Sequence, residues 1–295
     1  MIFIRRVFYV ICSFAGIVNF GTLIALTLKN ELIMKKIVLF LGITLILTSF
    51  KAFEKQPVKE TPYSTGEFFK FKISYSRFLS AGYATLELTE SVYNNKSVFY
   101  AKGYGTNTGL SKVFFKVEDH YQSYFDKETG KPYMAVRNIS EGNYKRNQRA
   151  YFNHNTNTVL WKDLGRNKEK TIGTPKNVQD VVSTFYYLRN HKDIDNLKPG
   201  QTIDIDMFFD DEIIKFKLKY NGKETIKTKF GNVSAMIFKP MVQSGRVFKE
   251  EESLTVWVSD DKNKAPLRIK ADLAVGSINA DLHEYKGLKY PLNQK

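Results

Sequence analysis

The feature that most constrains the fold is the alternation of apolar and polar residues in short segments along most of the chain. Between residues 67 and 76, for example, Phe69, Phe71, Ile73 and Tyr75 alternate with polar residues. Side chains on a β-strand point to opposite faces in turn, so a period of two gives each strand one apolar face. This pattern predicts a sheet protein with one face of each strand buried.

Similar segments follow along the chain, separated by turn-forming residues. Strands are predicted at 83–90, 97–104, 113–125, 132–140, 144–153, 156–162, 202–209, 214–220, 232–240, 253–259, 266–275 and 277–284. Asn94-Asn95 and Asn221-Gly222 are predicted to form hairpin turns, because these residue types adopt positive φ angles readily. The predicted fold class is therefore mainly β, with antiparallel strands in curved sheets or an open barrel.

One segment has a helical period instead. Thr174-Pro175 resembles an N-cap followed by proline at the first helical position. The apolar residues after it recur at intervals of three and four: Val178, Val181, Val182, Phe185 and Leu188. This spacing predicts one amphipathic helix at about 175–190.

The two halves of the chain share a spacing. Three pairs of identical residues stand 134 positions apart, namely Gly66 and Gly200, Glu118 and Glu252, and Gly142 and Gly276. We consider two interpretations. Either segments 66–172 and 200–290 are duplicated β units joined by the helix, or hairpins of similar length recur by chance in one domain spanning 66–290.

The first 52 residues are predicted to be a targeting region. Met34-Lys35-Lys36 followed by the apolar run to Phe50 has the form of a secretory signal, with the signal at 34–52. A second apolar stretch, Val7–Leu28, is long enough to span a membrane. Residues 1–33 therefore derive from an upstream start codon, which we favour, or they form a membrane anchor. The polar segment 53–65 reads as a linker.

The charge and the cysteine content limit which partners and which covalent links the chain can have. The chain has 45 Lys and Arg and 30 Asp and Glu, and the part after residue 52 keeps 39 basic and 29 acidic residues. Behind a signal, an excess of this sign favours anionic lipid or another anionic envelope component rather than nucleic acid, with plain solubility as the alternative. The single cysteine, Cys12, lies in the targeting region, so the rest of the chain forms no disulfide.

Several stretches resemble the DUF3108 family of exported bacterial proteins, over about residues 66–285. They are Gly66-Glu67, Ala81–Ala84, Val117–His120, Ser123–Asp126, Asp180–Arg189, Val256–Asp261 with Pro266, and Gly276-Ser277. As a domain of unknown function, the family implies no catalytic residues. The hairpin of Trp257 and Pro266 also resembles that of periplasmic lipoprotein carriers, which implies a concave apolar face behind a helix.

No constellation of catalytic, cofactor-binding or metal-ligating residues is predicted. His120, His154, His191 and His283 lack metal spacing, and Asp119 and His120 point to opposite faces if they lie on a strand. The remaining acidic candidates for a carboxylate pair or a cation site are Glu118, Glu141, Glu250–Glu252, Asp210–Glu212 and Asp260-Asp261. The 17 Tyr and 23 Phe exceed what one core face needs, so they either line a pocket or fill two packed layers.

These observations favour a non-enzymatic protein of the periplasm or outer envelope. We expect it to bind a hydrophobic or amphipathic envelope ligand, such as lipid, in a curved sheet, although the sequence does not identify the ligand-binding residues. The first alternative is a structural or assembly module that docks on another envelope protein. A less favoured alternative is a hydrolase of polysaccharide or cell wall.

Overall fold

The computed structural model describes residues 60–109, 112, 115–242 and 254–293. The predicted targeting region 1–52 and the first part of the predicted linker lie outside these residues. The end of that polar segment is packed rather than free, because Tyr63 is buried and its ring lies 5.7 Å from that of Phe99 and 4.9 Å from that of Tyr186. None of the helices in the described part of the chain is long and apolar enough to cross a membrane.

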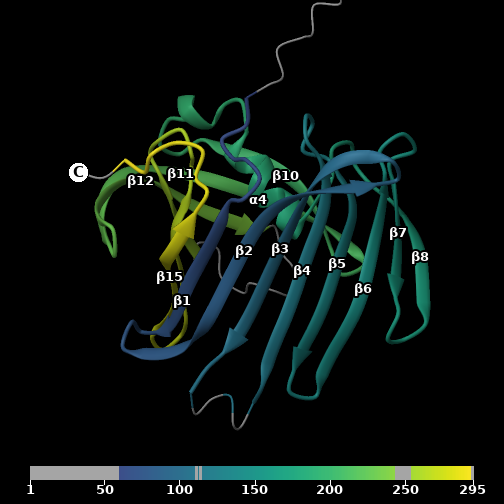
Figure 1. The fold of residues 1–295 in the computed structure, drawn as a ribbon, viewed down its shortest axis with the longest axis horizontal. Helices are drawn as coiled ribbons and strands as arrows, with labels where there is room; N and C mark the ends of the chain where they lie inside the picture. The colour runs from purple at the N-terminus through teal and green to yellow at the C-terminus, as the bar shows by residue number, and fades with distance from the viewer. Residues whose placement is uncertain (1–59, 110–111, 113–114, 243–253, 294–295) are drawn as a thin grey trace, which may run out of the picture. The chain divides into compact units, whose positions relative to one another are not determined.

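Fifteen strands form one curled sheet (Figure 1). They are β1 (Phe68–Tyr75), β2 (Leu79–Tyr93), β3 (Lys96–Asn107), β4 (Val117–Asp126), β5 (Pro132–Glu141), β6 (Tyr144–Asn153), β7 (Thr158–Asp163), β8 (Lys168–Gly173), β9 (Gln179–Asp180), β10 (Thr202–Phe209), β11 (Glu212–Thr228), β12 (Gly231–Val242), β13 (Leu254–Ser259), β14 (Pro266–Asp272) and β15 (Ser277–Lys286). Their order is β8-β7-β6-β5-β4-β3-β2-β1-β15-β14-β13-β12-β11-β10-β9. The sheet is open, because β8 and β9 are its two edges. The predicted mainly antiparallel, curved β fold is confirmed.

Alternation along each strand decides which face is buried. On β1, Phe69 and Phe71 are buried in a cluster with Leu282 of β15 and Leu267 of β14, while Lys72 is exposed. Burying large apolar side chains on one face is the main driving force for such a sheet, at about 1.5–3 kcal/mol for each. The buried face is the inner, concave one, which the helix also contacts.

Six strands of each half recur with one spacing. β1 to β6 and β10 to β15 have bounds that agree, after a shift of 134 residues, to within three residues at each end. Gly66 and Gly200, and likewise Gly142 and Gly276, all have positive φ angles. Each half is a meander of sequential neighbours. The origin of this recurrence by duplication stays a prediction.

The halves meet in two different ways. β1 pairs with β15 in an antiparallel ladder from Phe68 opposite Lys286 to Tyr75 opposite Ile278, which we call the closed junction. The corresponding strands on the other side, β6 and β10, do not pair with each other. We call this the open junction. The strands β7, β8 and β9 lie in the segment between the two halves.

The helix α4 (Val181–Arg189) lies on the concave side of the sheet and packs against β3, β4 and β10 (Figure 1). The predicted helix at about 175–190 is confirmed, but its predicted start at Thr174-Pro175 is wrong. The N-cap is Asp180, whose carboxylate accepts from the backbone N–H groups of Val182 and Ser183, at 2.7 and 2.9 Å. The hydroxyl of Ser183 accepts in return from the backbone N–H of Asp180, which completes a capping box. A short 3₁₀ helix, Ile194–Asn196, follows.

The predicted hairpin turn at Asn221-Gly222 is also wrong. β11 continues through both residues to Thr228, and the register between β11 and β12 shifts between Tyr220 and Gly222. Gly222 has a φ of 108°, which a β-bulge can use as well as a turn can. The chain reverses instead between Thr228 and Gly231.

Candidate ligand-binding cleft

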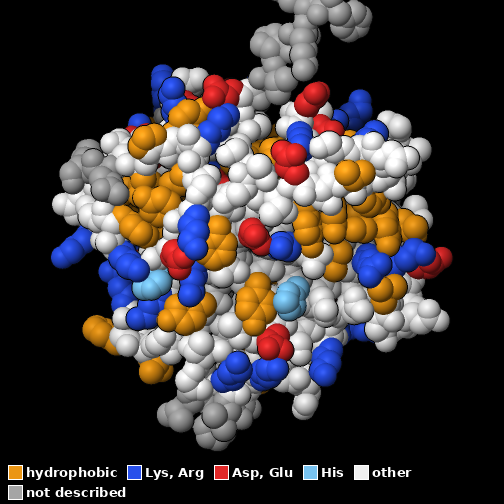
Figure 2. All heavy atoms as spheres, viewed as in Figure 1, with side chains coloured by type: hydrophobic (Ala, Val, Ile, Leu, Met, Phe, Trp, Pro, Cys, Tyr) orange, Lys and Arg blue, Asp and Glu red, His pale blue; other side chains and the backbone are white. Residues whose placement is uncertain are grey.

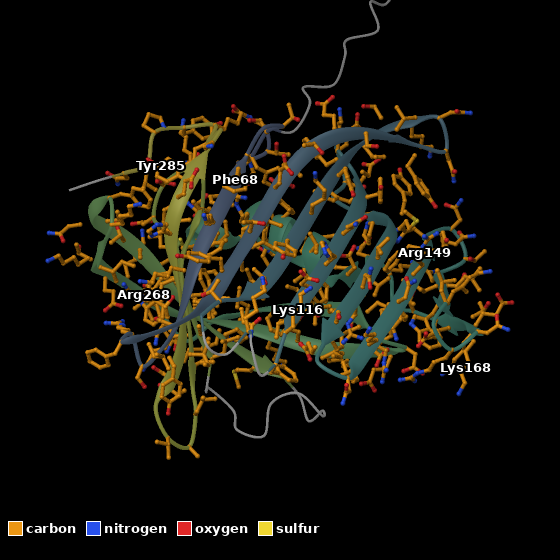
Figure 3. The ribbon with its side chains drawn as sticks, turned by 60° about the horizontal axis from the view of Figure 1, so that its bottom comes forward. Phe68, Lys116, Arg149, Lys168, Arg268 and Tyr285 are labelled. Atoms are coloured by element: carbon orange, nitrogen blue, oxygen red, sulfur yellow. The ribbon has the colours of Figure 1, made fainter. Side chains whose placement is uncertain are left out.

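A cleft lies at the open junction. Residues from β4, β5, β6 and β7 line one side, the end of β10 lines the other, and the first residues of α4 lie at its floor. Its apolar lining is Ala135, Val136, Ala150, Trp161, Val181, Val182, Phe208 and Phe209. The free volume is about 40 Å³, which is room for only a few waters at about 10–15 Å³ each. Figure 3 labels Arg149 on β6, which marks the first-half side of this junction.

Side chains rather than a strand ladder connect the two sides. The Nε2 of Gln148 donates to Oδ1 of Asp210 at 2.5 Å, and Nη1 of Arg137 donates to Oε1 of Gln148 at 2.9 Å. Nη1 of Arg137 also lies 3.8 Å from Oδ1 of Asp210, and Nζ of Lys170 lies 3.9 Å from Oδ2 of Asp211. The acidic turn between β10 and β11 thus holds the two sides of the open junction together through polar contacts.

The acidic residues that the sequence offered as a possible cation site, Asp210–Glu212 and Asp260-Asp261, include several that contact other parts of the protein. Asp210 and Asp211 contact cationic and amide groups across the junction. Asp260 pairs with Lys223 at 2.8 Å, and Asp261 caps the turn to Asn263. Among the described residues, no group of three or more His, Cys, Asp or Glu side chains is arranged to hold a metal ion.

Two buried polar atoms at the cleft have no hydrogen-bond partner. They are Nε1 of Trp161 and Nε of Arg137, and both residues line the cleft. Trp161 is 7% exposed, and it packs with Phe152 and Phe208, whose rings lie 6.0 Å apart. An unsatisfied buried donor costs about 1–3 kcal/mol, so such groups are usually paired with water or a ligand. The cleft therefore combines an apolar wall with unused donors.

The helix N-terminus at the floor is already occupied by a side chain. Besides its two bonds to α4, the carboxylate of Asp180 accepts from the hydroxyl of Ser123 at 2.6 Å. Burial raises the pKa of Asp180, and these hydrogen bonds act in the opposite direction. Because the cap residue satisfies the first N–H groups, the floor of the cleft contributes shape and apolar surface rather than an anion site.

A second buried polar cluster lies at the other end of α4. Arg189 forms a bidentate pair with Glu67, with N–O distances of 2.6 and 2.7 Å. Its Nε and Nη2 also donate to the backbone carbonyl of Asn263, at 3.1 and 2.9 Å. The guanidinium lies within 6 Å of four ring centroids, those of Tyr63, Phe69, Phe185 and Tyr186. The cluster ties the helix to the start of β1 and to the β13–β14 turn.

This cluster is structural rather than a binding site. Arg189, Glu67 and Asn263 are all buried, and the three nitrogens of the guanidinium are engaged by protein acceptors. Sequence reasoning did not single out either charged residue. A usable signal was present, because Glu67 and Arg189 both lie in the stretches that carry the family resemblance, and both stand beside apolar residues.

The other polar candidates from the sequence do not converge on one site. His120 lies against Tyr104 with ring centroids 4.8 Å apart, while Oδ1 of Asp119 accepts from the backbone N–H of Ser140 at 3.2 Å. His154 contacts the carbonyl of Pro132 at 2.7 Å, and burial lowers the pKa of its ring. The remaining two histidines contact Asp193 and Lys229 respectively.

One carboxylate pair does form. Burial and a hydrogen bond with Asp119 raise the pKa of Glu141, while Arg137 acts in the opposite direction. Hydrogen-bonded carboxyl groups stand closer than the roughly 5–5.5 Å used by retaining glycosidases. Glu118 instead pairs with Lys116 at 2.8 Å, and Glu250–Glu252 lie outside the described residues. The geometry gives the hydrolase hypothesis no support.

Comparison with known proteins adds a family and a fold. A family model described as a protein of unknown function (DUF3108) matches residues 70–283. A β-barrel-like protein of a domain of unknown function, DUF1849, from Brucella abortus has a TM-score of 0.52 at 10% identity, covering 77% of this chain and 98% of its own. No curated protein matches the sequence.

Two further solved structures align over the same share of this chain with TM-scores of 0.34. One is described as an exported protein with a YmcC-like fold from Bacteroides fragilis, at 9% identity with 98% of its own chain covered. The other is described as a lipoprotein from Parabacteroides distasonis, at 13% identity with 97% covered. The first of the three structures supports the fold, and none is similar enough in sequence to carry a function.

Proposed function

Because this chain belongs to the DUF3108 family, whose function is unknown, we propose from its own geometry that it binds an amphipathic envelope ligand at the open junction. The observation that carries the proposal is the cleft itself, where apolar side chains surround two buried donors without partners. An apolar pocket with a few convergent polar groups is the usual form of a small-molecule site.

The apolar and the polar part of such a ligand would contact different residues of the cleft. Its apolar part would lie against Trp161 and Phe208, where burial of a chain excludes water from both rings. Its polar or anionic head would accept from Arg137, whose Nε has no partner and whose Nη1 lies 3.8 Å from Asp210 across the junction. A lipid or fatty acid has this combination of groups.

Entry requires the junction to open, because a free volume of about 40 Å³ is too small for an acyl chain. Opening would break the hydrogen bond of Gln148 to Asp210, worth about 0.5–1.5 kcal/mol, and the longer contacts of Arg137 and Lys170 with the acidic turn, worth at most about 1 kcal/mol each. No ladder bond between β6 and β10 has to break. The open junction is thus the least costly place for the sheet to admit a ligand.

Location in the cell envelope is part of the proposal. It rests on the signal-like segment 34–52 and on the excess of basic residues in the rest of the chain. Export would place the protein where free lipids and anionic envelope components are available, which agrees with an amphipathic ligand.

The two tryptophans provide a direct test with a matched control. Trp161 lines the cleft, whereas Trp257 on β13 donates its Nε1 to Glu224, away from it. The Trp257→Phe variant reports on Trp161 alone, and Trp161→Phe reports on Trp257 alone. On titration with oleate, we expect a saturable change in the emission of Trp257→Phe and none in that of Trp161→Phe.

Two outcomes of these experiments would contradict the proposed lipid site. If the emission of Trp161 does not respond to oleate, and native mass spectrometry of the wild-type protein finds neither co-purified lipid nor bound oleate, the cleft is not a lipid site. An equal response of both variants would place the ligand elsewhere on the protein.

A further inference from the structure

Two neighbouring hairpin tips expose large apolar side chains to solvent. Phe78 and Leu79, at the β1–β2 turn, are 95% and 67% exposed, and Val275, at the β14–β15 turn, is 77% exposed. The tips are held side by side, because the hydroxyl of Tyr75 donates to the carbonyl of Val275 at 2.8 Å and the N–H of Ser76 donates to the carbonyl of Ser277 at 2.7 Å. Apolar groups clustered in this way usually mark a site of interaction.

A basic hollow adjoins these tips. It has a volume of about 270 Å³ and is lined by Lys72, Arg77, Lys227, Lys229 and Arg268, with Asp281 as its one acidic residue. Arg268 pairs with Asp281, whereas the other four cations form no ion pair with any residue that the structure describes. Burial and the neighbouring lysines lower the pKa of His283, so its imidazole is neutral at neutral pH. The positive charge of the hollow therefore comes from its lysines and arginines.

The hollow and the tips form one continuous surface. Arg77 lines the hollow and directly precedes Phe78 in the chain. Figure 2 shows basic side chains gathered around a histidine at the left of the molecule, with single apolar side chains projecting at the lower edge. Arg268 is labelled on the same side in Figure 3, far from Lys168 on β8. This side belongs to the closed junction and is distinct from the cleft.

We propose that this surface docks the protein on an anionic lipid membrane, with Phe78, Leu79 and Val275 entering the interface and the four cations without an ion pair contacting headgroups. The charge complementarity favours a membrane, because each basic side chain near an anionic surface strengthens binding and apolar tips add to it. Single projecting side chains on turns also suit a fluid interface better than a flat protein partner. The proposal does not depend on the ligand of the cleft.

The test places a reporter at one tip. In a Cys12→Ser background, Phe78→Cys labelled with an environment-sensitive dye is mixed with vesicles of phosphatidylcholine, or of equal phosphatidylcholine and phosphatidylglycerol. We expect a blue shift with the mixed vesicles and little with the neutral ones. Val92→Cys is the matched control, because Val92 is 69% exposed at the opposite end of β2. Any contribution of residues 1–59 to vesicle binding is common to both.

The role of charge has its own pair of variants. Adding Lys227→Gln and Lys229→Gln to the labelled protein should raise the lipid concentration at half response by roughly tenfold or more. Lys145→Gln with Lys168→Gln, two exposed lysines of β6 and β8, should leave it unchanged. The proposal is overturned if the dye at position 78 responds no more than the dye at position 92. It is equally overturned if neutral vesicles, or the variant lacking both lysines of the hollow, give the full response.

Discussion

The closed and open junctions join equivalent strands of the two halves, yet only one of them is a ladder. β1 and β15 pair along their lengths, whereas β6 and β10 meet through side chains such as Gln148 and Asp210. The segment between the halves explains the difference. β7 takes the free edge of β6 and β9 takes part of the edge of β10. An edge that is already paired cannot form a second ladder, so the cleft is a consequence of these added strands.

The comparison implies that stability is concentrated on the closed side, and the buried ion pair there offers the largest test. Glu67→Gln leaves Arg189 buried without its counter-charge, and removing one partner of such a pair costs about 3–5 kcal/mol. Urea unfolding followed by circular dichroism measures the loss. The rings around Arg189 remain, so the cost reports on charge rather than on packing.

An exposed pair serves as the control for that prediction. Glu87 lies 2.8 Å from Lys102, and each of the two side chains is 42% exposed. Glu87→Gln should therefore change the free energy of unfolding by at most about 1 kcal/mol. Equal effects of the two substitutions would contradict the assignment of the buried cluster as the main tie between α4, β1 and the β13–β14 turn.

A smaller effect is expected from loosening the open junction. Asp210→Ala removes the acceptor of Gln148 and the carboxylate that lies 3.8 Å from Arg137, at a cost of about 1–2 kcal/mol. We expect faster amide hydrogen exchange in β10 with β1 unaffected, because β1 is bonded on both sides. Asp204→Ala is the control on the same strand, where an exposed carboxylate lies 3.8 Å from Lys217. Faster exchange in β1 as well would mean that the junctions are not independent.

The sequence predicted what is local in this fold. The alternation of apolar and polar residues predicted most strands, because each strand buries one face independently of the others. The 3.6-residue period of apolar residues predicted the helix. Two local predictions were wrong, one because another residue performed the predicted role and one because the predicted residue performed another role. Asp180 caps the helix in place of Thr174, and Gly222 uses its positive φ in a bulge rather than in a turn.

What the sequence could not provide is contact between distant segments. Nothing in the pattern near Phe68 or Lys286 tells that these residues are opposite each other, or that Gln148 reaches Asp210. The cleft depends on which edges remain unpaired, which is a property of the whole sheet. The buried pair of Glu67 and Arg189 was missed for the same reason, since a charged residue is buried only where its partner arrives from elsewhere.

The smallest expected effect concerns pH at the rim of the open junction, where Arg137 contacts the junction and also lowers the pKa of Glu141. Because burial and Asp119 raise that pKa above its unfolded value of about 4.3, the folded state favours the protonated carboxyl. This contribution to stability is full below the unfolded pKa and is lost as pH rises through the folded one. As pH rises from about 4 through the folded pKa of Glu141, wild type should therefore lose urea resistance relative to Glu141→Gln.

Glu118→Gln is the control with the opposite sign. A hydrogen bond from Lys116 lowers the pKa of this exposed carboxyl, so its small contribution is present above the unfolded pKa and is lost as pH falls. Removing it should leave stability near neutral pH equal to or slightly below that of wild type. If Glu141→Gln and Glu118→Gln shift the pH profile in the same direction, the pairing of Glu141 with Asp119 does not hold in solution. Opposite shifts would agree with a protonated Glu141 beside Asp119 and an ionised Glu118 beside Lys116.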